Sequence, residues 1–92
     1  MPFQNYQTFA FNGRLPELPG VYGITNANHQ MIYVGETQGL ATRIAQHQAD
    51  KTHKMHRDAP ALIMFETITA GEVARKRREQ QLIAEYNPPA NA

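Results

Sequence analysis

The sequence predicts an α+β domain, in which a small three-stranded antiparallel sheet is flanked by helices. Residues 20–26 and 31–35 are apolar runs rich in β-branched and aromatic residues, and the polar stretch between them makes the pattern of a β-hairpin. Two helical patterns and one further apolar run follow the hairpin. The chain has 92 residues, which is enough for one small domain.

The first 17 residues are expected to form a lead-in that packs on one edge of the sheet, before a single domain over residues 18–92. The lead-in fits two patterns. Phe9-Ala10-Phe11 alternates like a short edge strand, whereas Phe3, Tyr6 and Phe9 would share one side of a short helix.

The second hairpin strand, residues 31–35, is short and apolar, so we expect it to lie centrally in the sheet. A helix is then predicted from about Leu40 to His47, because Leu40, Ile44 and His47 follow the i, i+4, i+7 spacing of one helical face. Arg43 lies four residues before His47, so their side chains are neighbours on that helix.

Residues 61–69 form the third predicted strand, and a second helix is predicted from about Gly71 to Tyr86. Glu79 shares a face with three apolar residues of that helix and is therefore drawn toward the core. A carboxylate in such a place must be paired, protonated or bound to a metal, because an isolated buried charge is very costly.

Composition excludes several classes of protein. The chain has no cysteine, so it has no disulfide and no cysteine-based zinc site. It starts without a secretory signal pattern, and no apolar run approaches the roughly 20 residues that span a bilayer. We therefore expect a soluble, cytoplasmic protein with no membrane partner.

The formal net charge is only +1, but basic residues gather in two segments. These segments supply candidate phosphate contacts, namely Lys51, Lys54, Arg57, Arg75 and Lys76. Taken alone, such charge runs are more often a solvated helix face and a polar loop. His53 and His56 could also share a metal ion, although two ligands are too few for a tight site.

Five residues could carry chemistry: Tyr22, Tyr33, Arg43, His47 and Glu79. Each has an ordinary structural explanation when taken singly, as a packing tyrosine, a surface arginine, a satisfied core histidine or a salt-bridged glutamate. Two tyrosines on paired strands, with an arginine on the next helix, would nevertheless place hydroxyls and a fixed positive charge on one surface.

Their spacing resembles a known family. Gly20-Val21-Tyr22 and Tyr33-Val34-Gly35, separated by ten residues, are similar to the signature of the GIY-YIG nucleases. The likeness spans residues 18–91. Four later positions match, in order, the family's helical arginine, its next histidine or tyrosine, its Glu-x-x-Leu-Ile glutamate and its closing Pro-x-x-Asn asparagine: Arg43, His47, Glu79 and Asn91.

The resemblance implies metal-dependent hydrolysis of phosphodiester bonds, with Mg²⁺ (or Mn²⁺) held by Glu79. Arg43 would bind the phosphate, and either Tyr22 or His47 would accept a proton from the attacking water. Tyr33 would orient the water or the phosphate. Asn91 would steady a phosphate or the tyrosine.

The implied partner is DNA, with RNA as the alternative, in repair or recombination, and the implied protein is a monomer or weak homodimer. So small a domain favours low sequence specificity, on single-stranded or branched DNA. Glu36 departs from the family pattern, because many members carry a lysine there. This departure keeps a second interpretation open, an inert nucleic-acid- or protein-binding module that retains the fold.

Overall fold

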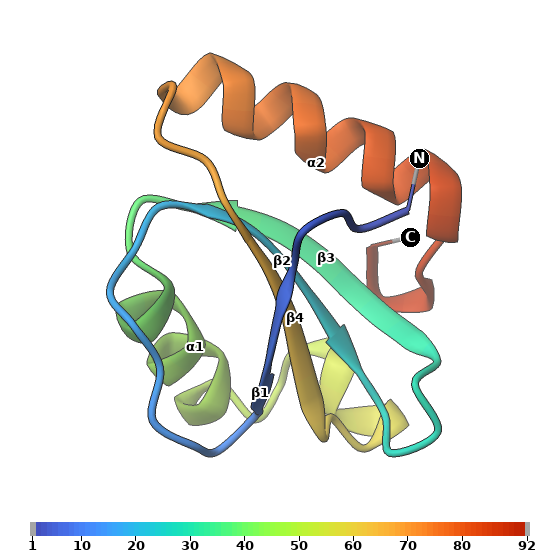
Figure 1. Ribbon diagram of the computed structural model, residues 1–92. Helices are drawn as coiled ribbons and strands as arrows, with labels where there is room; N and C mark the ends of the chain where they lie inside the picture. The colour runs from blue at the N-terminus through green and yellow to red at the C-terminus, as the bar shows by residue number, and fades with distance from the viewer. Residues whose placement is uncertain (1, 92) are drawn as a thin grey trace.

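The computed structural model describes residues 2–91 and contains a four-stranded antiparallel sheet in the order β1-β4-β2-β3 (Figure 1). The strands are β1 (Gln7–Ala10), β2 (Gly20–Thr25), β3 (Met31–Thr37) and β4 (Leu62–Thr67). The α+β class is confirmed, but the prediction of three strands is wrong. The lead-in contributes the additional strand, because β1 pairs with β4 at one edge.

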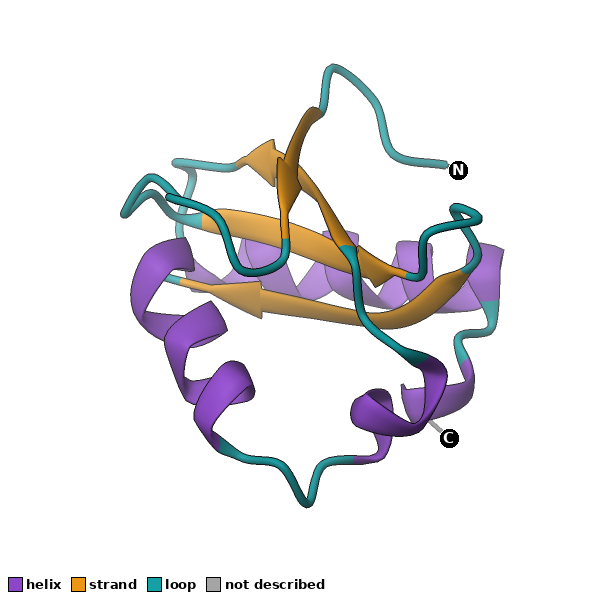
Figure 2. Ribbon diagram, turned by 90° about the horizontal axis from the view of Figure 1, so that it is seen from below, coloured by secondary structure: helices purple, strands orange, loops and turns teal. Residues whose placement is uncertain are grey.

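Helices cover both faces of the sheet. They are α1 (Leu40–Ala49) and α2 (Glu72–Tyr86), with short 3₁₀ turns η1 (Lys54–Asp58) and η2 (Pro89–Asn91). Figures 1 and 2 show α2 along one face and α1 on the other. None of the helices within residues 2–91 has the length and apolar character needed to cross a bilayer.

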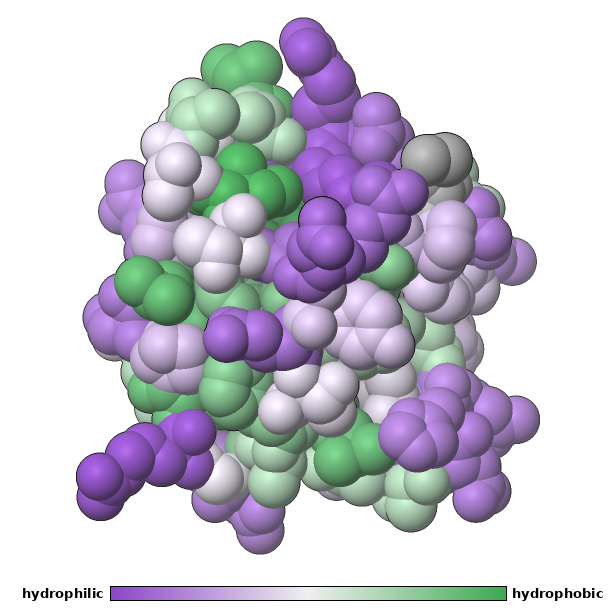
Figure 3. Space-filling view, in the orientation of Figure 1, coloured by the Kyte–Doolittle hydropathy of each residue, from purple (hydrophilic) through white to green (hydrophobic). Residues whose placement is uncertain are grey.

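The core consists of two apolar clusters, one on each face. Successive residues of β2 point to opposite faces, so Tyr22 packs toward α1 while Val21 packs toward α2. β2 is buried along its whole length. On the face seen in Figure 3, hydrophilic and hydrophobic residues are interspersed.

The prediction that residues 31–35 are central is wrong, because within residues 2–91 β3 is an edge strand that pairs with β2 alone. Its apolar character reflects packing on both faces. Part of its outer edge is satisfied by a side chain, since the Asn91 amide bonds both backbone groups of Val34. The Val34 N–H donates to Asn91 Oδ1 over 2.8 Å, and Asn91 Nδ2 donates to the Val34 carbonyl over 2.9 Å.

The start of α1 is held by residues 16–18, where the lead-in meets the domain. Gly39 is the N-cap and offers no side chain, so three N–H groups of the first turn, which have no acceptor within the helix, need other partners. Residues 16–18 supply them: Leu40 donates to the Leu18 carbonyl, Ala41 to the Pro16 carbonyl and Thr42 to the Glu17 carboxylate. This contact fixes α1, and with it Arg43, against the end of the sheet.

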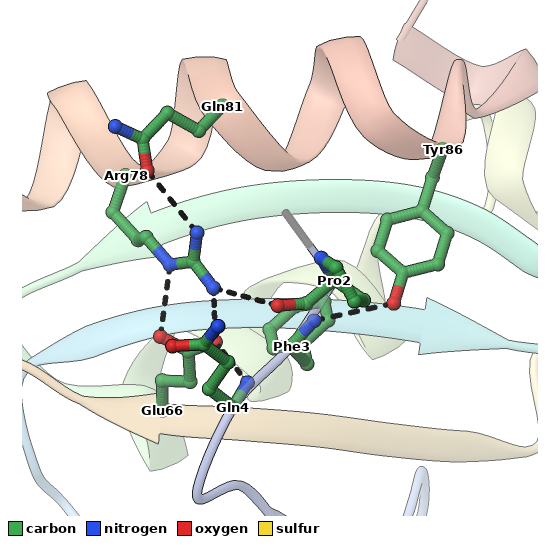
Figure 4. A network of polar contacts seen from close by, with 7 residues as sticks. All are labelled: Pro2, Phe3, Gln4, Glu66, Arg78, Gln81 and Tyr86. Carbon is green, nitrogen blue, oxygen red and sulfur yellow. Dashed lines mark hydrogen bonds and ion pairs between the residues drawn. The ribbon is translucent and has the colours of Figure 1, made fainter.

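A second polar cluster ties residues 2–4 to β4 and α2 (Figure 4). Arg78 of α2 binds both carboxylate oxygens of Glu66 at 3.0 and 2.8 Å and also donates to the Pro2 carbonyl. The Gln4 N–H donates to Glu66, and the Phe3 N–H donates to the Tyr86 hydroxyl. Arg78 Nη1 also donates to Gln81 Oε1 over 3.1 Å, and we call this whole set the Arg78 network.

Candidate active site

Tyr22 is the most deeply placed of the candidate residues. Its side chain is buried on the α1 side of the sheet, and its hydroxyl lies 2.7 Å from Nε2 of His47. Its ring crosses β3 above Gly35, its direct neighbour in the register. A Cβ at position 35 would lie 2.6 Å from Cζ of Tyr22, so the glycine of the Tyr-Val-Gly motif is required for this ring position.

Burial has opposite effects on the two members of this pair. It raises the pKa of Tyr22 well above its usual value, although the positive charge of Arg43 opposes the change. Burial also lowers the pKa of His47, and the charges of the neighbouring His53 and Arg43 act in the same direction, so that together they bring it from 6.5 to about 4. At neutral pH the pair is therefore a neutral phenol and a neutral imidazole, in which the Tyr22 O–H donates to Nε2.

Tyr33 joins the same group of rings from β3. Its ring centroid lies 6.2 Å from that of Tyr22 and 5.4 Å from that of His47. Burial, and next the charge of Glu79, raise the pKa of Tyr33, while Arg43 lowers it. Its hydroxyl has no hydrogen-bond partner within residues 2–91, so it is available to water or a ligand.

Arg43 lies beside these rings, on the exposed side of α1, one turn before His47. It lines a cleft of about 570 Å³ together with Glu36 and Arg75. No hydrogen bond or ion pair within the described chain engages its guanidinium. The cleft therefore has at least one unengaged fork of N–H donors, a geometry suited to phosphate oxygens.

Glu79 approaches from α2, on the other face of the sheet. Burial and the charge of Glu36 raise its pKa, whereas Lys76 and hydrogen bonds with the Glu36 backbone and Gln80 lower it. Its own charge raises the pKa of both Tyr22 and Tyr33, so the carboxylate and the rings lie within electrostatic reach across β3.

The surroundings of Glu79 fit Mg²⁺, because this ion is commonly held by one or two carboxylates, with water and substrate phosphate completing its shell. Residues 2–91 contain no group of three or more His, Cys, Asp or Glu side chains placed to share an ion. A single protein carboxylate would thus hold a metal jointly with the substrate.

Glu36 is not an unpaired carboxylate. Its side chain accepts a hydrogen bond from Nε of Arg75 at 2.9 Å, and Nζ of Lys76 lies 3.6 Å away. Arg75 is 5% exposed, so the basic run of α2 is neither wholly solvated nor wholly open to phosphate. The structure places Arg75 in an ion pair in the cleft wall, while Lys76 stays exposed.

The remaining predicted residues fall into two groups. Asn91 uses both ends of its amide on the Val34 backbone, so it contacts the strand next to Tyr33 and not the open site. Lys51, Lys54 and Arg57 are exposed along the turn and η1 that follow α1. They lie near the rings in sequence, since His53 falls between them.

Residue-by-residue reasoning left His53 and His56 outside the site, although their clustering with basic residues was visible. The His53 ring lies 5.1 Å from Tyr33 and 5.5 Å from His47. Nε2–H of His56 donates to the His47 carbonyl over 2.8 Å. We call the four rings of Tyr22, Tyr33, His47 and His53 the ring cluster.

Hydrolysis of a phosphate ester requires a proton acceptor for water, donors for phosphate oxygens and, commonly, a carboxylate for a divalent cation. This domain gathers groups of these kinds around β3, an arrangement expected of a small α+β hydrolase domain. A family model described as the GIY-YIG catalytic domain matches residues 18–91. The chain belongs to the GIY-YIG family, as its spacing predicted.

Curated relatives agree with this assignment. UvrABC system protein C of Psychrobacter cryohalolentis is 41% identical over 81 residues, covering 85% of this chain and 13% of that protein. The Streptomyces avermitilis protein of the same name is 32% identical over 85 residues, covering 86% and 12%. The chain thus spans about an eighth of the length of these relatives.

The fold matches solved structures as well. The N-terminal GIY-YIG endonuclease domain of UvrC from Thermotoga maritima, bound to magnesium as its catalytic divalent cation, is 30% identical with a TM-score of 0.68. The match covers 84% of this chain and 86% of that one. An asparagine-to-alanine variant of that domain with its cation bound matches with a TM-score of 0.63. The predicted class, a GIY-YIG endonuclease domain, is confirmed.

Proposed function

We propose that this chain hydrolyses phosphodiester bonds in DNA with the help of a divalent cation. The observation that carries the proposal is the buried 2.7 Å hydrogen bond between Tyr22 and His47, with the charge of Glu79 acting on the same tyrosine from across β3. The matches to UvrC proteins, including a domain bound to magnesium, support DNA and Mg²⁺ (or Mn²⁺) as substrate and cofactor.

The hydrogen bond between Tyr22 and His47 supports a base made of both residues, with His47 as the final proton acceptor. The buried Tyr22 phenol has a raised pKa and does not readily ionise, so it is a poor base by itself. Neutral His47 keeps a lone pair on Nε2 that can accept a proton. Water can pass a proton to the Tyr22 oxygen while the phenol proton moves to His47 Nε2. The resulting hydroxide attacks phosphorus, and the bond to the 3′ oxygen breaks.

The other site residues orient the reacting groups. Glu79 would hold Mg²⁺, which when bound stabilises the charge developing on the phosphate and on the leaving oxygen. The Arg43 fork donates to phosphate oxygens, and the Tyr33 hydroxyl orients the water or the phosphate. Asn91 acts indirectly in this scheme, because its contact with Val34 fixes the strand that carries Tyr33.

The nucleic-acid strand would lie over the exposed cations next to the site, Lys51, Lys54, Arg57 and Lys76. Contacts of this kind weaken as salt rises and carry little sequence information. We therefore propose an enzyme of low sequence specificity that acts on single-stranded or branched DNA during repair or recombination. A monomer or weak homodimer acting in the cytoplasm belongs to the same proposal.

The alternative of an inert module was favoured by Glu36, where many relatives carry lysine. In the structure, that carboxylate is paired with Arg75 and lies near Lys76, so it does not present an uncompensated negative charge to the cleft. With this objection weakened, the nuclease is the better-supported function.

A cleavage assay tests the proposal. Parent protein and the Glu79→Ala variant are incubated with labelled single-stranded DNA, duplex, flap DNA and RNA, each with Mg²⁺, Mn²⁺ or EDTA. We expect metal-dependent products from the parent and none from the variant. Equal cleavage by both would make the role of Glu79 wrong. Binding without cleavage of any substrate would support the inert module.

A further inference from the structure

His53 lies in the ring cluster although no motif of the family marks it. It precedes η1, and its ring meets Tyr33 and His47 almost edge-on, at interplanar angles of 84° and 78°. Tyr22 and His47 are buried, whereas His53 is partly exposed. The imidazole therefore lies at the solvent-facing rim of the cluster.

A hydrogen bond fixes the orientation of this ring. Nδ1 of His53 accepts the N–H of Met55 over 3.1 Å and so caps η1. A neutral imidazole has one proton, so a ring whose Nδ1 accepts must carry that proton on Nε2. Nε2–H has no hydrogen-bond partner within residues 2–91. The fold thus presents a directed donor that it does not use itself.

The neighbouring histidine, His56, differs from His53 because its Nε2–H donor is used within the protein. Nε2–H of His56 is engaged by the His47 carbonyl, and its ring packs against Phe11 at 6.3 Å. His56 therefore holds η1 against α1. Of these two histidines, only His53 leaves an N–H donor open.

Two further unused donors border the ring cluster, one of them on Tyr33, whose ring contacts that of His53. The Tyr33 hydroxyl and the Arg43 guanidinium also lack a partner in the described chain, and the charges of Arg43 and His53 both act on His47. Several convergent N–H and O–H donors are what a phosphate group requires. Exposed Lys51 and Lys54 flank His53 in sequence and add positive charge.

We propose that His53 is a further substrate-contacting residue, whose Nε2–H donates to a phosphate oxygen of a nucleic-acid strand bound at the ring cluster. The inference rests on the proposed nuclease function and deepens it. Proton transfer from water stays with Tyr22 and His47, while His53 binds and positions the phosphate.

Two substitutions separate the two nitrogens of the ring. In His53→Asn the amide oxygen can replace Nδ1 as the cap of η1, but the Nε2 donor is lost. In His53→Gln the amide nitrogen can reach the position of Nε2 and donate, but the cap is lost. Thermal midpoints of both variants measure the structural role separately.

On single-stranded DNA with Mg²⁺, we expect His53→Asn to lower kcat/KM by about tenfold to a hundredfold, the usual effect of losing a hydrogen bond to a charged group. His53→Gln should stay within about threefold of the parent. An asparagine variant that cleaves like the parent, or a glutamine variant that is equally impaired, overturns the proposal.

A binding measurement distinguishes failure of this inference from failure of the nuclease proposal. Imidazole ¹⁵N signals of the parent are followed by NMR as a thymidine hexanucleotide is added in EDTA. We expect the Nε2 signal of His53 to move while that of His56 stays in place. If the parent cleaves nothing, a shift at His53 still supports the phosphate contact, and an unchanged signal overturns it.

Discussion

The two polar clusters of this domain lie on opposite faces of one sheet, and their donors are used to different extents. In the Arg78 network, Nε, Nη1 and Nη2 of Arg78 all donate within the protein, and Glu66 accepts on both oxygens (Figure 4). In and beside the ring cluster, the donors of Tyr33, His53 and Arg43 have no partner in residues 2–91.

This difference in pairing separates polar groups that stabilise the fold from polar groups that are available to a ligand. No buried side-chain nitrogen or oxygen in the described chain lacks a hydrogen-bond partner, so the unused donors all reach solvent. An unpaired donor that stays hydrated costs the fold little, whereas a buried one would cost about 1–3 kcal/mol. The ring cluster can therefore keep donors for a ligand, and the Arg78 network fixes the chain.

The largest expected effect comes from removing one hydroxyl from each region. Tyr22→Phe should lower kcat about 10²- to 10⁴-fold, because the proton path to His47 is lost. Tyr86→Phe removes a hydroxyl that only accepts the Phe3 N–H, so it should cost about 1 kcal/mol of unfolding free energy and leave kcat unchanged. Single-turnover cleavage and urea unfolding of both variants make the test. Equal kcat values for the two variants would contradict the assignment of a functional role to the ring cluster and a structural role to the Arg78 network.

The next effect concerns stability, and the basic run of α2 supplies its own control. Arg78→Gln leaves the Glu66 carboxylate, 11% exposed, without its cation, which should cost about 3 kcal/mol. Arg77→Gln changes an exposed neighbour and should stay within about 0.5 kcal/mol of the parent. Urea unfolding measures both. Well below its midpoint, Arg78→Gln should still cleave at the parent rate.

Acid should weaken the protein through the ring cluster. The pKa of His47 falls from 6.5 in the unfolded chain to about 4 in the fold, so between these values the unfolded state binds more protons. This contribution is complete above pH 6.5 and is lost as pH falls toward 4, by up to about 3 kcal/mol. His47→Gln should lose less stability than the parent between pH 7 and pH 4. Parallel losses would show that other groups dominate.

Local signals explain what the sequence could predict. The hairpin and both long helices depend on spacing within a few residues, and they lie close to where the sequence predicts them. The family motifs are recognised by their order along the chain, and the family model matches residues 18–91. Pairing of β1 with β4 joins segments more than 50 residues apart, so the alternation of Phe9-Ala10-Phe11 could suggest a strand without showing its partner.

The position of β3 was missed for a related reason. An apolar strand signals burial of its faces, which the adjacent helices provide, and says nothing about its edges. Here the Asn91 amide satisfies backbone groups that a neighbouring strand would otherwise bond. The resemblance marked Asn91 as important, but its contact with Val34 required the fold.

The sequence also could not show which cations of the basic run, residues 75–78, form ion pairs. Arg75 and Arg78 are three residues apart on α2, yet one pairs with Glu36 of β3 and the other with Glu66 of β4. The sequence shows four consecutive cations, and only the packing of α2 across the sheet decides which meet a carboxylate. Glu36, a departure from the family pattern in sequence, is therefore half of an ion pair.

The smallest expected effect concerns the Glu36–Arg75 ion pair, which shares features with both the Arg78 network and the ring cluster. Like the Arg78 network it is paired inside the protein, but it also lines the cleft beside Arg43. A double-mutant cycle of Glu36→Gln and Arg75→Gln should give a coupling free energy of about 1 kcal/mol in unfolding. A matched cycle with Lys76→Gln should give less than about 0.5 kcal/mol, since Lys76 is 59% exposed.

The same variants decide which region the pair belongs to. If coupling between Glu36 and Arg75 appears only in unfolding, the pair is structural and the functional surface ends at Arg43. If the coupling free energy measured from kcat/KM exceeds the one measured from unfolding, Arg75 belongs to the substrate site, because a purely structural pair would not produce that excess. We expect the first result, since Arg75 is buried and its Nε donates to Glu36, whereas Arg43 is exposed and has no partner among residues 2–91.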